Sequence, residues 1–202
     1  MKAAIPMTVL TSVSRLIAGL LLLAGCFALA APVAPVKAAG LEGTKTIYLV
    51  DNAGEEREIG TATFSKADGA VSITIALDQG RFSEKFLSMR PFRCIDGPKQ
   101  TACHLPYPYE LKDRITPEDL SDLEYRLLFL HKGPTDYGID AWNGLYYKFE
   151  LAADGTLKGK LHEADFNVLA VPPAQAFSKP IGPADLVPGE EGRHRFPSLT
   201  IR

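Results

Sequence analysis

From residue 45 onward, apolar and polar residues alternate along the chain in the pattern of half-buried β-strands. Positions 71–77 show it best, with Val, Ile and Leu at the odd positions and Ser, Thr and Ala at the even ones. The stretch 58–64 before them is rich in β-branched residues. Asp68-Gly69 separates the two runs and favours a tight turn, because glycine adopts positive φ easily. The pattern predicts a β-hairpin.

A second hairpin is predicted where Asp154-Gly155 joins the runs 145–151 and 157–161. In the first run the apolar residues at odd positions share one face, opposite Tyr, Lys and Glu at even positions. Short strands separated by such turns predict a mainly β fold, a single antiparallel β-barrel or sandwich domain with one short helix. After His162-Glu163 the apolar residues move to even positions, which predicts a β-bulge or strand break there.

The segment 116–132 carries two patterns at once. Thr116-Pro117 followed by two acids is typical of a helix start, and leucines then recur at helical spacing as far as residue 130. Residues 123–131 also alternate as a strand would. We predict a short helix at 117–122 followed by a strand, and whether 123–131 is strand or helix stays open on the sequence alone.

The C-terminal segment 172–202 has a different character. It holds six of the 15 prolines and three glycines, with no sustained periodicity. Such a stretch either wraps along the surface or stays mobile. The sequence therefore predicts a β domain over 45–171 and a Pro/Gly-rich tail over 172–202.

The first 40 residues have the pattern of a targeting segment. Residues 16–36 carry no charge, their first part is strongly apolar, and an Ala-Leu-Ala sequence ending at residue 30 fits cleavage of a secretory signal. The sequence predicts a signal peptide over 1–30 and a linker over 31–44. Pro32 and Pro35 argue against the alternative of a retained membrane span.

Leu23-Ala24-Gly25-Cys26 resembles the lipobox of bacterial lipoproteins. The resemblance implies an alternative signal over 1–25, with Cys26 becoming the lipidated first residue of the mature chain. The acyl chains would then anchor the protein, so a membrane partner is expected only if Cys26 is lipidated. By either route the predicted location is the periplasm or the cell envelope.

Cys94 and Cys103 are the two cysteines outside the targeting segment. The turn Asp96-Gly97-Pro98 between them brings two extended segments together, so in an oxidising compartment they are expected to form a disulfide. Closing so short a loop stabilises a fold by about 2–3 kcal/mol. The spacing fits neither a zinc site nor a thioredoxin motif.

Charge and motifs narrow the function classes. Removing 1–30 leaves 20 basic and 24 acidic residues, a mildly acidic domain for which no nucleic-acid partner is expected. The chain has no GxSxG, HExxH, phosphate-loop or dinucleotide motif. His162 and Glu163 lie on opposite faces of a strand, which disfavours a metal site. Neither a cofactor nor a metal is expected.

Two groups of residues are candidates for ligand binding. The first surrounds the disulfide: Arg90 and Arg93 with His104 and Tyr107 offer guanidinium forks for a carboxylate or phosphate, or simply pair with nearby acids.

The second group is the loop that holds Tyr137, Asp140, Trp142 and Asn143. Aromatic rings beside hydrogen-bonding groups suit sugars or other amphipathic ligands. The alternative is that Trp142, the chain's one tryptophan, plugs an end of the β domain.

These observations predict a non-catalytic binding module for a small amphipathic ligand or an envelope protein. One alternative is an envelope hydrolase that uses His104 or Asp140 as acid or base, or the carboxylate pair Asp140 and Glu163. Another is a structural interaction protein whose tail docks elsewhere. The ligand and the oligomeric state do not follow from the sequence.

Overall fold

The structure of the chain, a computed structural model, describes residues 41–88 and 90–202. The predicted signal peptide over 1–30, the lipidation candidate Cys26 and most of the predicted linker over 31–44 lie outside the described residues. Within the described part, no helix is both long enough and apolar enough to cross a bilayer.

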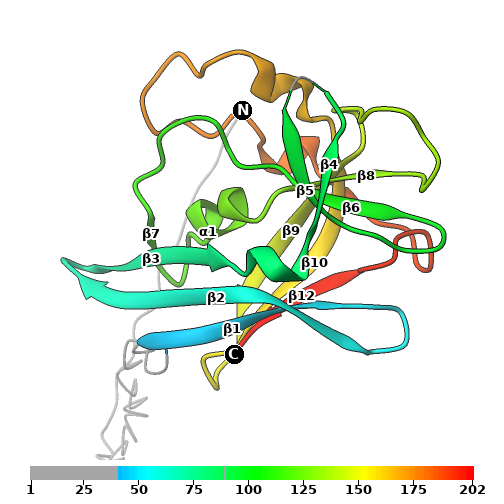
Figure 1. Cartoon of the computed structure of the whole chain (residues 1–202). Helices are drawn as coiled ribbons and strands as arrows, with labels where there is room; N and C mark the ends of the chain where they lie inside the picture. Colours follow the sequence, from blue (N-terminus) through cyan, green and yellow to red (C-terminus); the bar gives the residue numbers. More distant parts are fainter. Residues whose placement is uncertain (1–40, 89) are drawn as a thin grey trace, which may run out of the picture. The chain divides into compact units, whose positions relative to one another are not determined.

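The described residues form one antiparallel sheet of twelve strands (Figure 1). The strands are β1 (Gly43–Val50), β2 (Glu56–Ala67), β3 (Ala70–Leu77), β4 (Ser83–Phe86), β5 (Pro91–Ile95), β6 (Thr101–His104), β7 (Arg114–Ile115), β8 (Phe129–Lys132), β9 (Gly144–Leu151), β10 (Leu157–Ala164), β11 (Val187–Pro188) and β12 (Ser198–Ile201). The helical elements are α1 (Ser121–Arg126) and the 3₁₀ turns η1 (Gln79–Arg81), η2 (Phe166–Ala170) and η3 (Pro183–Asp185).

The sheet runs in the order β4-β5-β6-β8-β9-β10-β12-β1-β2-β3-β7, with β11 paired to β10 off this path. It is open, because the path begins at β4 and ends at β7. The prediction of a mainly β, antiparallel domain with one short α-helix is confirmed. Both predicted hairpins form, β2 with β3 and β9 with β10, and Gly69 and Gly155 adopt the positive φ that their turns need (72° and 79°).

Two hydrophobic cores lie on opposite faces of the strands β5, β6, β8 and β9. Neighbouring residues on each strand divide between them: Ile95, Ala102, Phe129 and Leu145 belong to one core, and Cys94, Cys103, Leu130 and Tyr146 to the other. Because successive strand residues point to opposite faces, these strands are covered on both sides. The second core is closed over by Tyr107 and Leu111 from one loop and by Leu169 and Ile181 from another.

The predicted β-bulge or strand break at His162-Glu163 is wrong. Strand β10 keeps its register with β9 through His162↔Tyr146, Glu163↔Leu145 and Ala164↔Gly144. The apolar residues change parity there because the buried face changes: Leu161 faces the first core and Ala164 the second. A strand covered on both faces shows this parity change without any extra residue.

The register shift that the structure does contain lies in β2. Ile47 of β1 pairs with Gly60, whereas Tyr48 pairs with Glu58, so Ile59 is the extra residue of a β-bulge. Gly60 has φ of 154°, and a Cβ atom there would lie 2.3 Å from the carbonyl oxygen of Ala76. The bulge therefore depends on glycine.

The helix begins later than predicted. Residues 117–120 do not form it; the backbone N–H of Asp119 instead donates to Thr116 Oγ1 (3.1 Å), which closes a turn. The helix α1 follows over Ser121–Arg126, and β8 begins at Phe129. The order of helix then strand is right, and the ambiguous stretch 123–131 is divided between the two.

Helix α1 lies between the edges of two strands. The Asp122 carboxylate accepts the backbone N–H of Arg114 in β7 (3.0 Å), and the Glu124 carboxylate accepts that of Phe149 in β9 (2.9 Å). Both carboxylates are buried. They satisfy strand N–H groups that have no neighbouring strand, which couples the helix to both edges.

The segment 172–202, which the sequence separates from the β domain, ends inside the sheet. Strand β12 lies between β10 and β1, with Leu199 and Ile201 fully buried in the first core. Four residues are too few to show a periodicity, so the prolines and glycines around them dominated the sequence pattern. The part before β12 runs over the second core and contributes Ile181 to it.

Candidate ligand-binding site

The first predicted group, around the disulfide, is used for structure. Arg93 and His104 pair across β5 and β6, but the Arg93 guanidinium bonds to the Glu84 carboxylate (3.0 Å). His104 Nε2 lies 3.1 Å from the carbonyl oxygen of Arg126, and its ring packs edge-on against Phe129. Burial lowers the pKa of His104, which keeps the imidazole neutral near pH 7.

Tyr107 and Arg90 do not converge on a ligand either. Tyr107 is buried in the second core, donates its hydroxyl to the carbonyl oxygen of Ser178 (3.1 Å) and packs edge-on against Tyr125. The Arg90 guanidinium lies over the Phe92 ring, 5.6 Å from its centre. Tyr107 is thus part of the second core, whereas Arg90 lies exposed above one of its rings.

The predicted disulfide is confirmed. Cys94 and Cys103 lie directly opposite each other on β5 and β6, with their sulfur atoms 2.11 Å apart. The bond lies in the second core and holds the base of the loop between the two strands.

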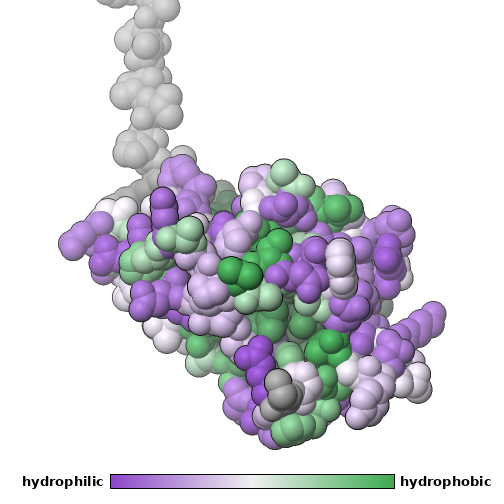
Figure 2. Space-filling view, turned by 90° about the horizontal axis from the view of Figure 1, so that it is seen from above, coloured by the Kyte–Doolittle hydropathy of each residue, from purple (hydrophilic) through white to green (hydrophobic). Residues whose placement is uncertain are grey.

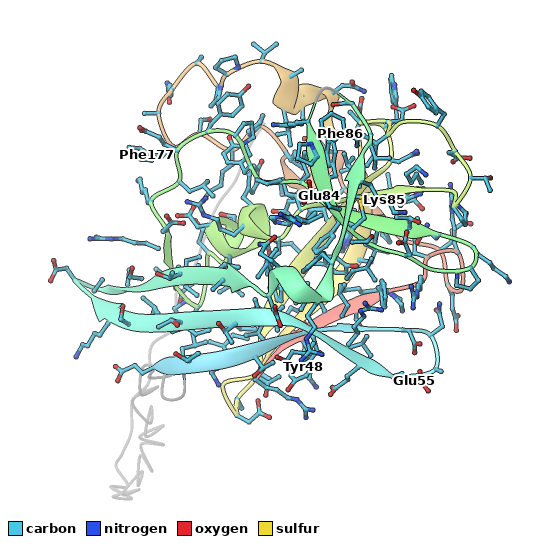
Figure 3. All side chains as sticks on the ribbon, in the orientation of Figure 1. Tyr48, Glu55, Glu84, Lys85, Phe86 and Phe177 are labelled. Atoms are coloured by element: carbon cyan, nitrogen blue, oxygen red, sulfur yellow. A yellow bond between two sulfur atoms is a disulfide. The ribbon has the colours of Figure 1, made fainter. Side chains whose placement is uncertain are left out.

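The second predicted group lies in the loop between β8 and β9, at residues 133–143. Tyr137 is fully exposed (108%) and Trp142 is 68% exposed. The interpretation of Trp142 as a plug is therefore wrong. Other exposed apolar side chains, such as Phe86 and Phe177, lie at the upper end of the molecule, away from Tyr48 and Glu55 (Figure 3). From above, hydrophobic residues run across the middle of this end, with hydrophilic residues on both sides (Figure 2).

Hydrogen bonds hold the 133–143 loop in one conformation. The backbone N–H of Gly133 donates to Asp136 Oδ2 (2.7 Å), and that of Trp142 donates to Asp140 Oδ1 (3.0 Å). The Asn143 carbonyl accepts from the His131 N–H (2.9 Å), which fastens the loop to the end of β8. These bonds constrain both ends of the loop.

This loop borders an open, shallow hollow of about 460 Å³. Its lining is mostly polar, with a smaller apolar part to which Leu87 and Ile139 belong; the lining residues are Leu87, Lys132, Asp136, Tyr137, Gly138, Ile139, Asp140, Ala141 and Asn143. The Lys132 ammonium donates one of its three N–H groups to the carbonyl oxygen of Gly133 (2.8 Å). The groups at the hollow are therefore this ammonium, two carboxylates, an amide and the Tyr137 ring.

Three of the four residues predicted in this loop, Tyr137, Asp140 and Asn143, line the hollow together. Asp136 and Ile139, which belong to the loop predicted to bind a ligand, line it as well, and so does Leu87, which the sequence did not indicate. Leu87 comes from the turn after β4, about fifty residues earlier in the chain, and no local pattern connects it with the loop. Asp136 and Ile139 belong to the same loop segment as the predicted residues, so their proximity follows from the sequence.

Of the groups named for the hydrolase alternative, Asp140 lines this hollow, whereas Glu163 does not. His104 is buried in the contacts described above and does not line it. In the described part of the chain, the one histidine that bonds to a carboxylate is His194, whose Nε2 lies 2.8 Å from Glu163 Oε1. Its Nδ1 faces the side-chain amide of Gln100 (3.0 Å), so neither ring nitrogen is free to act as a base. Across residues 41–88 and 90–202, no three His, Cys, Asp or Glu side chains are placed to hold a metal ion.

Comparisons with protein-family models, with curated proteins and with solved structures find no match for this chain.

Proposed function

We propose that this protein is a non-catalytic binding module that holds a small amphipathic molecule in the hollow of the 133–143 loop. The observation that carries the proposal is the divided lining, in which Leu87 and Ile139 lie on one cavity with Asp140 and Asn143. Pockets of about 300–1,000 Å³ suit small molecules, so the volume favours such a ligand over an envelope protein.

The lining suggests how such a ligand binds. The exposed Tyr137 ring offers a flat surface on which a sugar ring or another apolar face can stack. Asp140 uses Oδ1 for the Trp142 N–H, which leaves Oδ2 to accept hydroxyl groups of the ligand. The Asn143 side chain can both donate and accept. Because hydrogen bonds already hold both ends of the loop, binding orders less of the backbone and costs less conformational entropy.

We also propose that the protein acts after export, in the periplasm or the cell envelope. The disulfide between Cys94 and Cys103 supports this, because such bonds persist in oxidising compartments. Mass spectrometry of the purified mature protein tests the proposal directly. A new N-terminus after residue 30 or a lipid on Cys26 is the expected result, and a full-length, reduced chain from the cytosol contradicts it.

The binding proposal can be tested with a panel of hexoses, N-acetylated amino sugars and short alkyl glycosides. Trp142 is the only tryptophan, so its fluorescence reports on this loop alone. Saturation-transfer NMR identifies which compounds bind. We expect Tyr137→Ala to weaken binding about tenfold, since stacking and apolar contact are lost together. Asn143→Ala should weaken it as well.

The matched control is Tyr48→Ala, which removes a tyrosine from the opposite end of the molecule (Figure 3). Its affinity should equal that of the unchanged protein. Equal losses in Tyr137→Ala and Tyr48→Ala, or no binding by any compound of the panel at millimolar concentration, would refute this site.

A further inference from the structure

A second hollow lies on another part of the surface, where three loops meet. Its volume is about 260 Å³, and it is lined by Asn52, Pro98, Lys99, Gln100, Gly192, Arg193, His194 and Arg195. Asn52 belongs to the turn between β1 and β2, residues 98–100 to the loop between β5 and β6, and residues 192–195 to the segment before β12. The three segments lie close together in Figure 1, at the right of the molecule.

The charge of this lining differs from that of the whole chain. The protein has 24 acidic and 22 basic residues, yet the hollow is lined by Lys99, Arg193 and Arg195 and by no acid. Asn52 and Gln100 add two amides. Cations that gather in a concave, partly enclosed place produce a local positive potential that attracts anions.

The floor of the hollow is fixed by hydrogen bonds. The backbone N–H of Arg195 donates to Gln100 Oε1 (3.1 Å), so the amide nitrogen of Gln100 points at His194 Nδ1 and donates to it (3.0 Å). His194 therefore carries its proton on Nε2 and donates it to Glu163 (2.8 Å). Asn52 Nδ2 donates to the His194 carbonyl from the other side (2.7 Å). His194 itself is 2% exposed.

Arg193 and Arg195 flank His194, which these hydrogen bonds hold in place. Arg195 is held by the carbonyl of Asp96 and lies over the Phe196 ring, 4.7 Å from its centre. Arg193 contacts Glu163 at 3.4 Å and Glu190 at 3.7 Å, with its own side chain about half exposed. Contacts this long and this exposed are weak, so an incoming anion can compete for the guanidinium.

We propose that this hollow binds a small oxyanion, a phosphate or carboxylate group of a ligand. Arg193 presents the guanidinium fork that matches two oxygens of such a group, and Lys99 adds a mobile point charge from the opposite loop. The site is separate from the amphipathic site of the 133–143 loop and does not depend on it, since the two linings share no residue.

Isothermal titration calorimetry and backbone NMR with inorganic phosphate and with citrate test the proposal on the full mature protein. We expect binding at millimolar or lower concentration, with shifts of the amide signals of Gln100, Arg193 and Arg195. Lys99→Met and Arg193→Met should each weaken binding at least fivefold, and the affinity should fall as salt is added.

The control is Lys158→Met, which removes one positive charge from an exposed position of β10. If this variant loses as much affinity as Lys99→Met, the anion responds only to net charge and the site is refuted. Absence of binding at 10 mM, or amide shifts confined to other loops, also overturns it. Whichever of phosphate and citrate binds more tightly shows whether the site prefers a phosphate or a carboxylate group.

Discussion

Two pairs of carboxylates in this protein have opposite surroundings. Asp122 and Glu124 on α1 are 2% and 0% exposed, and each accepts a backbone N–H from a strand edge. Asp136 and Asp140 in the 133–143 loop are exposed and line a hollow. Both pairs lie near short, irregular segments, and nothing in the residue types distinguishes them.

The difference shows what burial does to an acid. A carboxylate enclosed by protein must be matched by donors, and Glu124 is met by the Tyr146 hydroxyl (2.5 Å), the Lys148 ammonium (3.2 Å) and the Phe149 N–H. Such a group is fully used by the fold. A loop carboxylate such as Asp140 accepts one backbone N–H and keeps an oxygen for a ligand.

The largest effect is expected from Glu124→Ala. The change leaves the Phe149 N–H and the Tyr146 hydroxyl without their acceptor in a buried place, and the loss should be about 3–5 kcal/mol of unfolding free energy. Urea denaturation measures it. The control is Glu150→Ala, on the exposed face of β9, the strand that holds Tyr146 and Phe149. It should change the unfolding free energy by about 0.5 kcal/mol or less. Similar losses in both variants would show that Glu124 is not a structural acid.

The next largest effect is expected from removing the disulfide in the second core. Replacing Cys94 and Cys103 together by Ser should lower the unfolding free energy by about 2–3 kcal/mol, because the reduced chain regains the entropy that the short loop had lost. The amphipathic site should survive in the folded fraction, since the disulfide does not line it. Adding reductant to the unchanged protein serves as the control and should give the same shift of the urea midpoint.

A third test extends the comparison to imidazoles. Burial lowers the pKa of His104, and burial with the nearby His194 lowers that of His131 to about 4. In the unfolded chain both imidazoles bind a proton near pH 6.5, whereas in the folded chain they bind it only at lower pH. Stability should therefore be constant above about pH 7 and fall below it, by at most about 1.4 kcal/mol per pH unit for each histidine.

The variant His131→Gln should flatten this decline between pH 6.5 and 4.5. Its stability at pH 8 gives the part of the change that does not depend on protonation. An unchanged slope in the variant would contradict a neutral, partly buried His131.

The smallest effect on stability is expected from Asp140→Asn. The side chain is exposed and the amide oxygen can still accept the Trp142 N–H, so unfolding free energy should change by about 0.5 kcal/mol or less. Affinity for a ligand of the 133–143 hollow should fall nonetheless. A large loss of stability would place Asp140 with the buried acids of α1.

Much of the sheet could be predicted from the chain. The hairpins at Asp68-Gly69 and Asp154-Gly155 have local causes, strand alternation and turn residues that accept positive φ, and both form. The disulfide was predicted for a similar reason, since a ten-residue segment with a central turn brings its own ends together. The candidate residues Tyr137, Asp140 and Asn143 also share one loop, so their proximity followed from sequence.

The failures concern contacts between distant segments. The bulge predicted at His162-Glu163 assumed one buried face, whereas loops from residues 105–111 and 166–181 cover the other. The sequence also did not reveal that Arg93 contacts the Glu84 carboxylate or that His104 contacts the Arg126 carbonyl. Strand β12 gave no pattern of its own, because its place depends on pairing with β1 and β10.

The amino-acid sequence by itself determined the antiparallel β class, the two Gly turns, the Cys94–Cys103 pair and a loop rich in aromatic and polar side chains. Each of these depends on residues close together in the chain, where backbone preference and alternation act directly. Only the tertiary structure decided which acids are buried, which face of each strand is covered and where cations converge. Those outcomes depend on segments brought together from as far apart as residues 52 and 194, and burial exists only after the chain has folded around them.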